Sequence, residues 1–213
     1  MTRTQWASVT AVVLALLFAG AATVASAGPE PSAQTAPAAD SADAGFARDM
    51  SVHHQQAVEM SFIVRDRTKD EEVRRLAYDI ANTQANQRGM MLGWLDMWGL
   101  PKVAPGVEPM AWMGMPSHGP SHSGGGSHSG GLMPGMATAA RMDQLRAASG
   151  RQAEVLYLRL MTEHHKGGVH MAQGCVDKCR PGVERDLAQG MVDAQESEIL
   201  LMADLLKKRG AKP

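Results

Sequence analysis

The chain has 213 residues, and its 21 Lys and Arg against 22 Asp and Glu give a formal net charge of −1. A near-neutral chain without a basic patch is not typical of a nucleic-acid-binding protein, so we expect no nucleic-acid partner. The composition is unusual in one respect, because it contains 16 Met but only 3 Phe and 2 Tyr.

The first 27 residues have the pattern of a signal peptide. Arg3 supplies the positive start, residues 11–22 are almost entirely apolar, and Ala25-Ser26-Ala27 forms a cleavage site before Gly28. We therefore expect an exported protein, either secreted or held in the periplasm or cell envelope. An uncleaved membrane anchor is the alternative, because residues 7–24 are about long enough to span a bilayer.

Four further segments follow the signal: a linker, two helical hairpins and the loop between the hairpins. Residues 28–44 are rich in Ala, Pro and Ser and predict a disordered linker. Residues 45–213 predict one helical domain, with a first hairpin over 45–100 and a second over 142–210. Between the hairpins, residues 101–137 form a loop rich in Gly, Met and His that lacks the periodicity of a core element.

The two hairpins are copies of one another at a constant offset of 111 residues. Met50-Ser51-Val52-His53-His54 aligns with Met161-Thr162-Glu163-His164-His165, and the matches continue through the second helix of each hairpin. Two such hairpins supply four amphipathic helices, and an antiparallel bundle is the simplest way to bury their apolar stripes together. The sequence therefore predicts an all-α, four-helix fold.

Both histidine pairs lie on the apolar stripe of their helix when residues are placed at about 100° intervals. Imidazole nitrogens removed from water need partners, imidazole binds several transition metals, and thioether sulfur favours Cu(I). We therefore predict a copper site, Cu(I) or Cu(II), with one centre or two left open. The expected ligands share inward helix positions: His53, His54, His164, His165, Met50, Met60, Met91, Met161, Met171 and Met202. Gln84 and Gln195 are expected to accept the second ring N–H of the ligating histidines and so fix their tautomer.

The loop between the hairpins carries a second set of soft ligands. Its residues do not follow a core pattern, so its methionines and histidines have no evident packing role. Metal capture and a non-binding linker are both open interpretations. The residues expected to capture metal are Met110, Met113, Met115, His118, His122 and His128.

Cys175 and Cys179 are the only cysteines. On an intact helix, side chains four residues apart lie about 5–6 Å from each other, which is too far for a disulfide. Because Arg180-Pro181-Gly182 predicts that the helix ends there, and because export favours oxidation, we expect a disulfide. A thiolate metal site is the alternative.

These motifs resemble the DUF305 family, whose members are mostly exported and have a ferritin-like four-helix core. The resemblance runs from about Gly45 to Gly210 and rests on the two His-His motifs and on Leu132-Met133-Pro134-Gly135-Met136. It implies copper handling, with a copper exporter or another envelope copper protein as a candidate partner. Gly167-Gly168 departs from the family pattern and is expected to weaken the helix beside His164 and His165.

The expected function is copper binding and buffering for copper tolerance, without enzymatic activity. A metal-free structural or interaction module is the alternative. A ferritin-like di-iron oxidase is the least favoured, because such sites use Glu-x-x-His motifs and the chain contains none.

Overall fold

The computed structural model describes residues 35–114 and 131–212. The chain divides into two units, residues 1–36 and residues 37–213. All helices described here lie in the second unit. The expected signal peptide, the linker up to residue 34 and four of the expected capture residues, Met115, His118, His122 and His128, lie outside the described residues.

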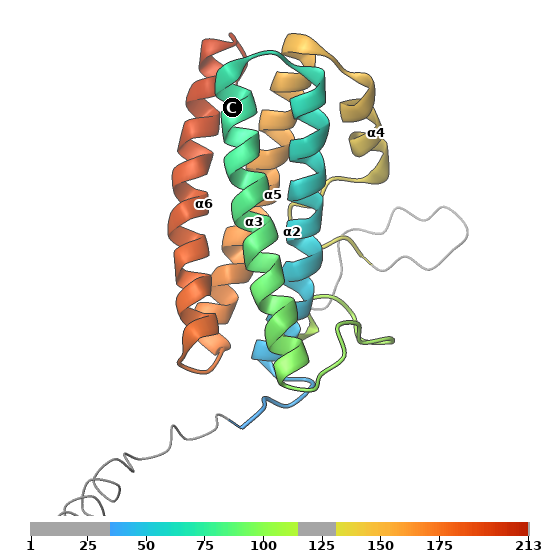
Figure 1. Ribbon diagram of the computed structural model, residues 1–213, viewed down its shortest axis with the longest axis vertical. Coiled ribbons are helices and arrows are strands. Elements are labelled where there is room, and N and C mark those ends of the chain that lie inside the picture. Colours follow the sequence, from blue (N-terminus) through green and yellow to red (C-terminus); the bar gives the residue numbers. More distant parts are fainter. Residues whose placement is uncertain (1–34, 115–130, 213) are drawn as a thin grey trace, which may run out of the picture. The chain divides into compact units, whose positions relative to one another are not determined.

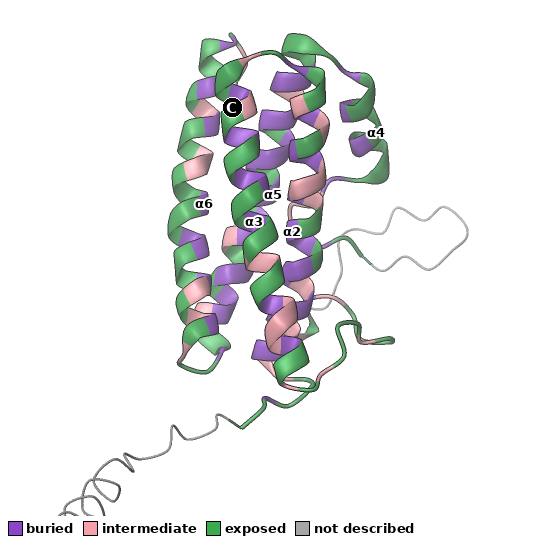
Figure 2. Cartoon of the chain, in the orientation of Figure 1, coloured by how far each residue is buried: buried purple, intermediate pink, exposed green. Residues whose placement is uncertain are grey.

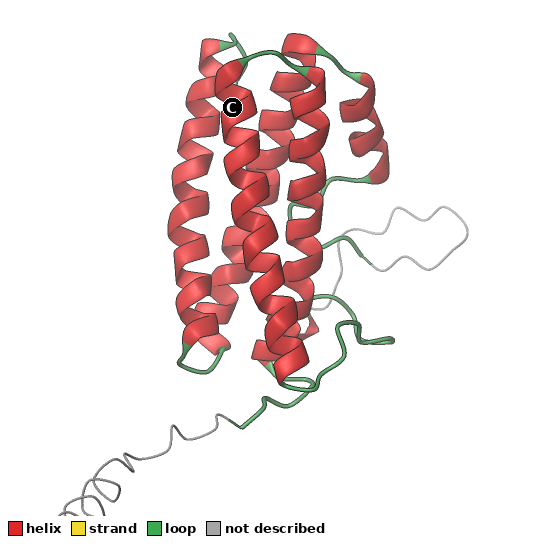
Figure 3. Cartoon of the chain, in the orientation of Figure 1, coloured by secondary structure: helices red, strands yellow, loops and turns green. Residues whose placement is uncertain are grey.

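Four long helices form the bundle, and all regular structure in the described ranges is helical (Figure 3). They are α2 (Ala42–Arg67), α3 (Glu71–Met97), α5 (Gly150–Lys178) and α6 (Val183–Lys208). A shorter helix α4 (Ala139–Ala147) and a 3₁₀ turn η1 (Ala111–Met113) lie between α3 and α5 in the chain (Figure 1). The predicted all-α bundle of two hairpins is confirmed.

The helix boundaries follow from local capping chemistry. The Ser41 hydroxyl accepts a hydrogen bond from the Ala44 amide (3.2 Å), and the Asp70 carboxylate accepts one from the Val73 amide (2.9 Å). Gly182, at φ 149°, precedes α6 in a backbone conformation that side-chain-bearing residues rarely adopt. The second hairpin therefore breaks at Arg180-Pro181-Gly182, as the sequence predicts, and the first breaks just before its cap residue Asp70.

Two of the expected segment boundaries are wrong. Helix α2 begins at Ala42, inside the expected linker, because Ser41 caps it and the Arg48 guanidinium donates a hydrogen bond to the Ala39 carbonyl (2.7 Å). The second hairpin is preceded by a separate helix, α4, which ends before Ser149. Helix α4 lies outside the repeat and buries Met142 and Leu145 against the bundle.

The helices pack most closely within each hairpin, α2 on α3 and α5 on α6, and α2 also packs along α5. Helices α3 and α6 face each other across a looser seam. Figure 2 shows the buried faces turned toward the bundle interior. Among the described residues, no helix is both long and apolar enough to cross a membrane.

The core consists of two apolar halves with the histidines between them. One half contains Met60, Val64 and Ile80, and the other contains Met50, Met91 and Met171. On α2, His53 and His54 lie between Met50 of one half and Ala57 of the other. The fold therefore places a polar layer across an otherwise apolar interior.

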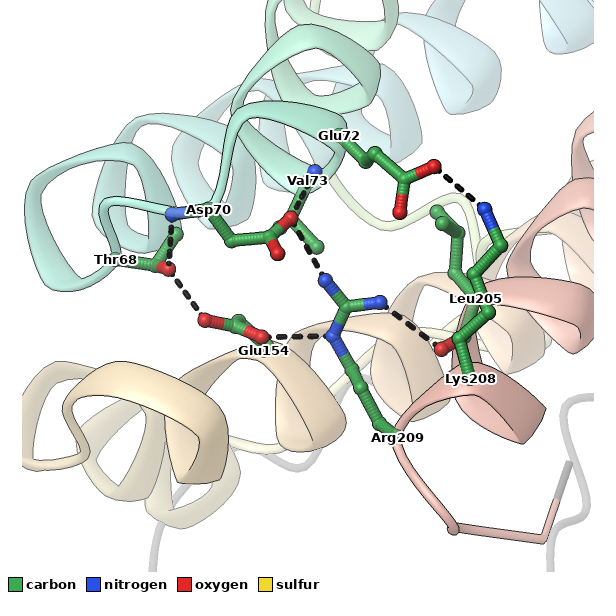
Figure 4. A network of polar contacts seen from close by, with 8 residues as sticks. All are labelled: Thr68, Asp70, Glu72, Val73, Glu154, Leu205, Lys208 and Arg209. Atoms are coloured by element: carbon green, nitrogen blue, oxygen red, sulfur yellow. Dashed lines mark hydrogen bonds and ion pairs between the residues drawn. The ribbon is translucent and has the colours of Figure 1, made fainter.

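A polar network joins the two hairpins at one end of the bundle (Figure 4). The Arg209 guanidinium, near the end of α6, pairs with Glu154 of α5 (2.7 Å) and with Asp70 at the start of α3 (2.7 Å). Glu154 also accepts a hydrogen bond from Thr68 (2.5 Å). Arg209 and Glu154 are both buried, so each neutralises the charge of the other in a dry environment.

Candidate metal centre

The four predicted histidines come together in one cluster. His53 and His54 project from α2, His164 and His165 project from α5, and all four have no exposed surface. The ring centroids of His53 and His164 are 3.8 Å apart, and those of His164 and His165 are 6.3 Å apart. The repeat therefore builds one central cluster, where the sequence left one centre or two open.

Each histidine makes one hydrogen bond through Nε2. The partners are the Pro134 carbonyl for His53 (3.0 Å), the Gln87 amide oxygen for His54 (2.8 Å), the His53 carbonyl for His164 (3.0 Å) and the Glu198 carboxylate for His165 (2.7 Å). Because these oxygens only accept hydrogen bonds, Nε2 carries a proton, and in the neutral ring the lone pair therefore lies on Nδ1. None of the four buried Nδ1 atoms has a hydrogen-bond partner.

Burial keeps His53, His54 and His164 neutral. Desolvation lowers the pKa of His53 to about 4, with a further lowering by His165. It lowers the pKa of His54 to about 3, helped by the charge His53 would carry, and it lowers the pKa of His164 well below its ordinary value. Neutral imidazole is the form that ligates metals, so these three histidines can act as nitrogen donors at neutral pH.

The six expected methionine ligands are all fully buried on either side of the histidine layer. Met50, Met91 and Met171 belong to one half of the core, and Met60, Met161 and Met202 belong to the other. The Met202 sulfur accepts a hydrogen bond from the Thr162 hydroxyl (3.7 Å). Thioether sulfur therefore flanks the cluster in both halves of the core.

Within the described ranges, no three His, Cys, Asp or Glu side chains are arranged to hold a metal ion. A metal bound at the Nδ1 atoms would therefore need thioether ligands or a shift of the imidazole rings. The donor set fits a soft metal, because it offers neutral nitrogen and sulfur rather than several carboxylates.

The expected orienting role of Gln84 and Gln195 is wrong. Their amide oxygens are buried without a hydrogen-bond partner, and the imidazole partners are Gln87 and Glu198 instead. Gln87 and Glu198 lie one helical turn further along α3 and α6, on the same face as the expected pair. Helical periodicity places both pairs inward, but it does not say which of them reaches the ring nitrogen.

A contact from the loop to His53 was also missed. Pro134 supplies the carbonyl that binds His53 Nε2, and a Cβ atom at Gly167 would overlap that carbonyl. A Cβ atom at Gly168 would likewise overlap the Gln195 side chain. Helix α5 runs unbroken through both glycines. Their missing side chains allow the loop and α6 to approach α5 closely.

The described parts of the loop pack against the bundle, contrary to the expectation that their methionines have no packing role. Met110 and Met133 are buried, and Met113 and Met136 are partly buried against the same core half. Asp49 accepts hydrogen bonds from the Met110 amide (2.8 Å) and the Trp112 indole (2.9 Å). Met110 and Met113 are therefore not free loop ligands.

Cys175 and Cys179 form a disulfide at the end of α5, with a Cα–Cα distance of 4.8 Å. Cys179 is the C-cap residue in an extended conformation, which brings the two side chains closer than an intact helix would. No cysteine of the described chain is free, so the alternative of a thiolate metal site is contradicted.

The fold and the cluster define a class of protein: an internally duplicated four-helix bundle with an imidazole cluster buried at its centre. The family described as "Domain of unknown function (DUF305)" matches residues 43–206. The chain belongs to the DUF305 family.

Solved structures show the same fold. A DUF305 protein from Streptomyces coelicolor, inferred to be secreted, is 70% identical over 82% of this chain and 98% of that chain, with a TM-score of 0.73. A DUF305 fragment from Deinococcus radiodurans is 32% identical over 78% of this chain and 96% of that chain, with a TM-score of 0.62. CopM, solved in a Cu(I)-bound form, is 21% identical over 78% of this chain and 96% of that chain, with a TM-score of 0.56. No curated protein matches the chain significantly.

Proposed function

We propose that this protein binds copper outside the cytoplasm at the cluster of His53, His54, His164 and His165, and buffers the metal without catalysing a reaction. The observation that carries the proposal is the set of four buried Nδ1 atoms without a hydrogen-bond partner. A buried polar atom left without a partner costs about 1–3 kcal/mol. Metal binding at these atoms would remove that cost.

The ligand chemistry favours copper over other metals. Neutral imidazole suits copper, zinc, iron and nickel, whereas thioether sulfur narrows the choice to Cu(I). Buried methionines lie on both sides of the cluster. The fold relative CopM has been solved in Cu(I)-, Cu(II)- and Ag-bound forms, which supports a metal-binding role for this fold.

Export is supported by the signal pattern in the first 27 residues and by the relative from Streptomyces coelicolor that is inferred to be secreted. In that setting, Met115, His118, His122 and His128 would collect copper and deliver it to the bundle. A copper exporter or another envelope copper protein is the partner that such a buffer would serve.

The test is a titration of the purified protein with Cu(I) against a competing chelator, and with Cu(II) separately. We expect tight Cu(I) binding that is lost when all four cluster histidines are replaced by Phe, which keeps an aromatic ring and removes the nitrogens. His170→Phe is the matched control, because His170 lies on α5 but is exposed. Circular dichroism confirms that each variant is folded.

Two outcomes contradict the proposal: no binding of either oxidation state tighter than micromolar, or retained binding in the folded four-histidine variant. The first would favour a metal-free structural module. That second candidate is supported by the close packing of the His53 and His164 rings. A metal-free module would also show the same melting temperature with and without Cu(I), because a ligand bound only to the native state must raise it.

A further inference from the structure

The two halves of the histidine cluster differ in one chemical group. Gln87 and Glu198 occupy equivalent positions in the repeat, and each accepts a hydrogen bond from the second histidine of its own hairpin. His54 binds a neutral amide oxygen at 2.8 Å, whereas His165 binds a carboxylate at 2.7 Å. The two repeats therefore differ in charge at this position, because the second has a carboxylate where the first has a neutral amide.

A carboxylate changes the donor strength of the imidazole it holds. Accepting the Nε2 proton in a charge-assisted hydrogen bond raises the basicity of Nδ1 and fixes the tautomer. A neutral amide fixes the tautomer but adds less electron density. His165 Nδ1 is therefore the stronger of the two equivalent donors.

The same residues line a small cavity between α3 and α6, of about 10 Å³. Its lining consists of repeat-equivalent pairs, including Thr83 with Ala194, Gln84 with Gln195, and Gln87 with Glu198. The cavity therefore lies on the pseudo-twofold axis. The Glu198 side chain is 25% exposed, whereas the His165 side chain it binds is fully buried. Glu198 thus connects the surface of this seam to the cluster.

Charge balance also points to a particular class of ion. Imidazole ligates a metal in its neutral form, and Glu198 is the one described carboxylate hydrogen-bonded to any of the four histidines. One carboxylate balances one positive charge, and a divalent ion would leave a net charge in the dry core, which is costly.

From these observations we propose that a monovalent soft cation, Cu(I) or Ag(I), enters along the α3–α6 seam and is held first by Nδ1 of His165, with Glu198 as the positioning residue. The proposal rests on the proposed function, because it assigns the ion and the route to the same cluster. It predicts that the half of the site containing His165 binds the cation more tightly than the half containing His54.

The first experiment uses two variants of the purified protein, each of which gives the two repeat-equivalent positions the same side chain. Glu198→Gln makes both halves neutral, and Gln87→Glu makes both charged. We expect Glu198→Gln to weaken Ag(I) and Cu(I) binding by about 10- to 100-fold, as loss of such a group does in other metal sites. Glu198→Asp should restore part of the affinity, and Gln87→Glu should not weaken it.

A second readout separates positioning from simple structural support. In protein labelled with ¹⁵N-histidine, substoichiometric Ag(I) should shift His165 Nδ1 before the His54 nitrogens, and this order should disappear in Glu198→Gln. Ala194→Trp, which fills the seam, should slow Ag(I) uptake. Gln189→Trp, at an exposed position on the same helix, should leave the uptake rate unchanged.

The outcomes separate the two proposals. Wild-type protein that binds neither Cu(I) nor Ag(I) overturns the proposed function itself. Wild-type protein that binds Ag(I) tightly, while Glu198→Gln binds it equally well or Ala194→Trp takes it up at the wild-type rate, overturns this inference and leaves copper binding intact. Tighter binding of Zn(II) than of Ag(I) would also contradict the assignment of a monovalent ion.

Discussion

Nε2 of His164 donates a hydrogen bond to the backbone carbonyl of His53, its own counterpart in the first repeat, at 3.0 Å. The reciprocal bond is absent, because His53 turns its Nε2 to the carbonyl of Pro134. His164 on α5 is thus held by a carbonyl of α2, whereas His53 on α2 is held by a carbonyl of the loop between the hairpins. Although the bundle is duplicated, the equivalent histidines of its two halves have different hydrogen-bond partners.

The contact between this loop and α5 predicts that adding one methyl group at Gly167 destabilises the protein strongly. Gly167→Ala would place a Cβ atom on the Pro134 carbonyl, and because both partners are backbone, neither can move cheaply. We expect a loss of about 1–3 kcal/mol in the free energy of unfolding, as for overpacking elsewhere, measured by urea denaturation.

Gly190→Ala is the matched control for Gly167→Ala. Gly190 lies within α6 and has open space around its Cβ position, so alanine should stabilise the protein by about 0.5–1 kcal/mol. Equal effects of the two substitutions would show that the Pro134 carbonyl does not press on α5.

Glu184 predicts a stabilising substitution. Its carboxyl is buried with both oxygens unpartnered, whereas its repeat counterpart is the fully buried Val73. Burial, reinforced by Asp43, raises the pKa of Glu184 to about 9. Above the unfolded value of 4.5, the unfolded state holds fewer protons than the folded state, so this group lowers stability as the pH rises toward 9. Glu184→Gln should therefore stabilise the protein by about 1–3 kcal/mol at pH 8 and by less at pH 5.

Urea denaturation at the two pH values measures the effect of Glu184→Gln. The pH dependence is the decisive part of the result. A gain of the same size at pH 5 and pH 8 would mean that the carboxyl is already ionised in the folded protein.

The buried histidines predict that the metal-free protein is acid-sensitive. The pKa of His53 is lowered to about 4 and that of His54 to about 3, from 6.5. Below pH 6.5 the unfolded state binds protons that the folded state excludes. Stability should therefore fall by about 1.4 kcal/mol per pH unit for each such histidine between pH 6.5 and 4.

Glu184 acts in the opposite direction over part of this range, so the acid sensitivity is best measured in the Glu184→Gln background, by urea denaturation with a chelator present. His54→Phe should reduce the slope, and exposed His170→Phe should not. A flat profile between pH 6.5 and 4.5 would mean that the histidines are accessible to protons in the fold.

The network in Figure 4 predicts unequal costs for two neighbouring basic residues. Arg209→Ala leaves the buried carboxylate of Glu154 without its charged partner and should cost about 3–5 kcal/mol. Lys208→Ala removes an exposed pair with Glu72 and should cost about 0–1 kcal/mol. Thermal unfolding of both variants gives the comparison, and similar losses would contradict a buried role for Arg209.

Much of the candidate site could be predicted because it depends on short-range periodicity. The side chains of His53 and His54 face the core because they lie on the same face of α2 as Met50 and Ala57. Any helix with this sequence would place them on one face. The hydrogen-bond partners could not be predicted in the same way. Pro134 lies 81 residues from His53 in the chain, and Glu198 lies 33 residues from His165, so these contacts depend on how separate elements pack.

The amino-acid sequence by itself determined the duplicated hairpins, the break at the end of α5 and the inward direction of His53, His54, His164 and His165, because helix periodicity, proline and glycine act locally. Only the tertiary structure decided that the four histidines form one cluster, that Gln87 and Glu198 replace Gln84 and Gln195 as their partners, and that the Pro134 carbonyl reaches His53. These outcomes depend on the distance and rotation between separate elements, which local sequence patterns do not specify.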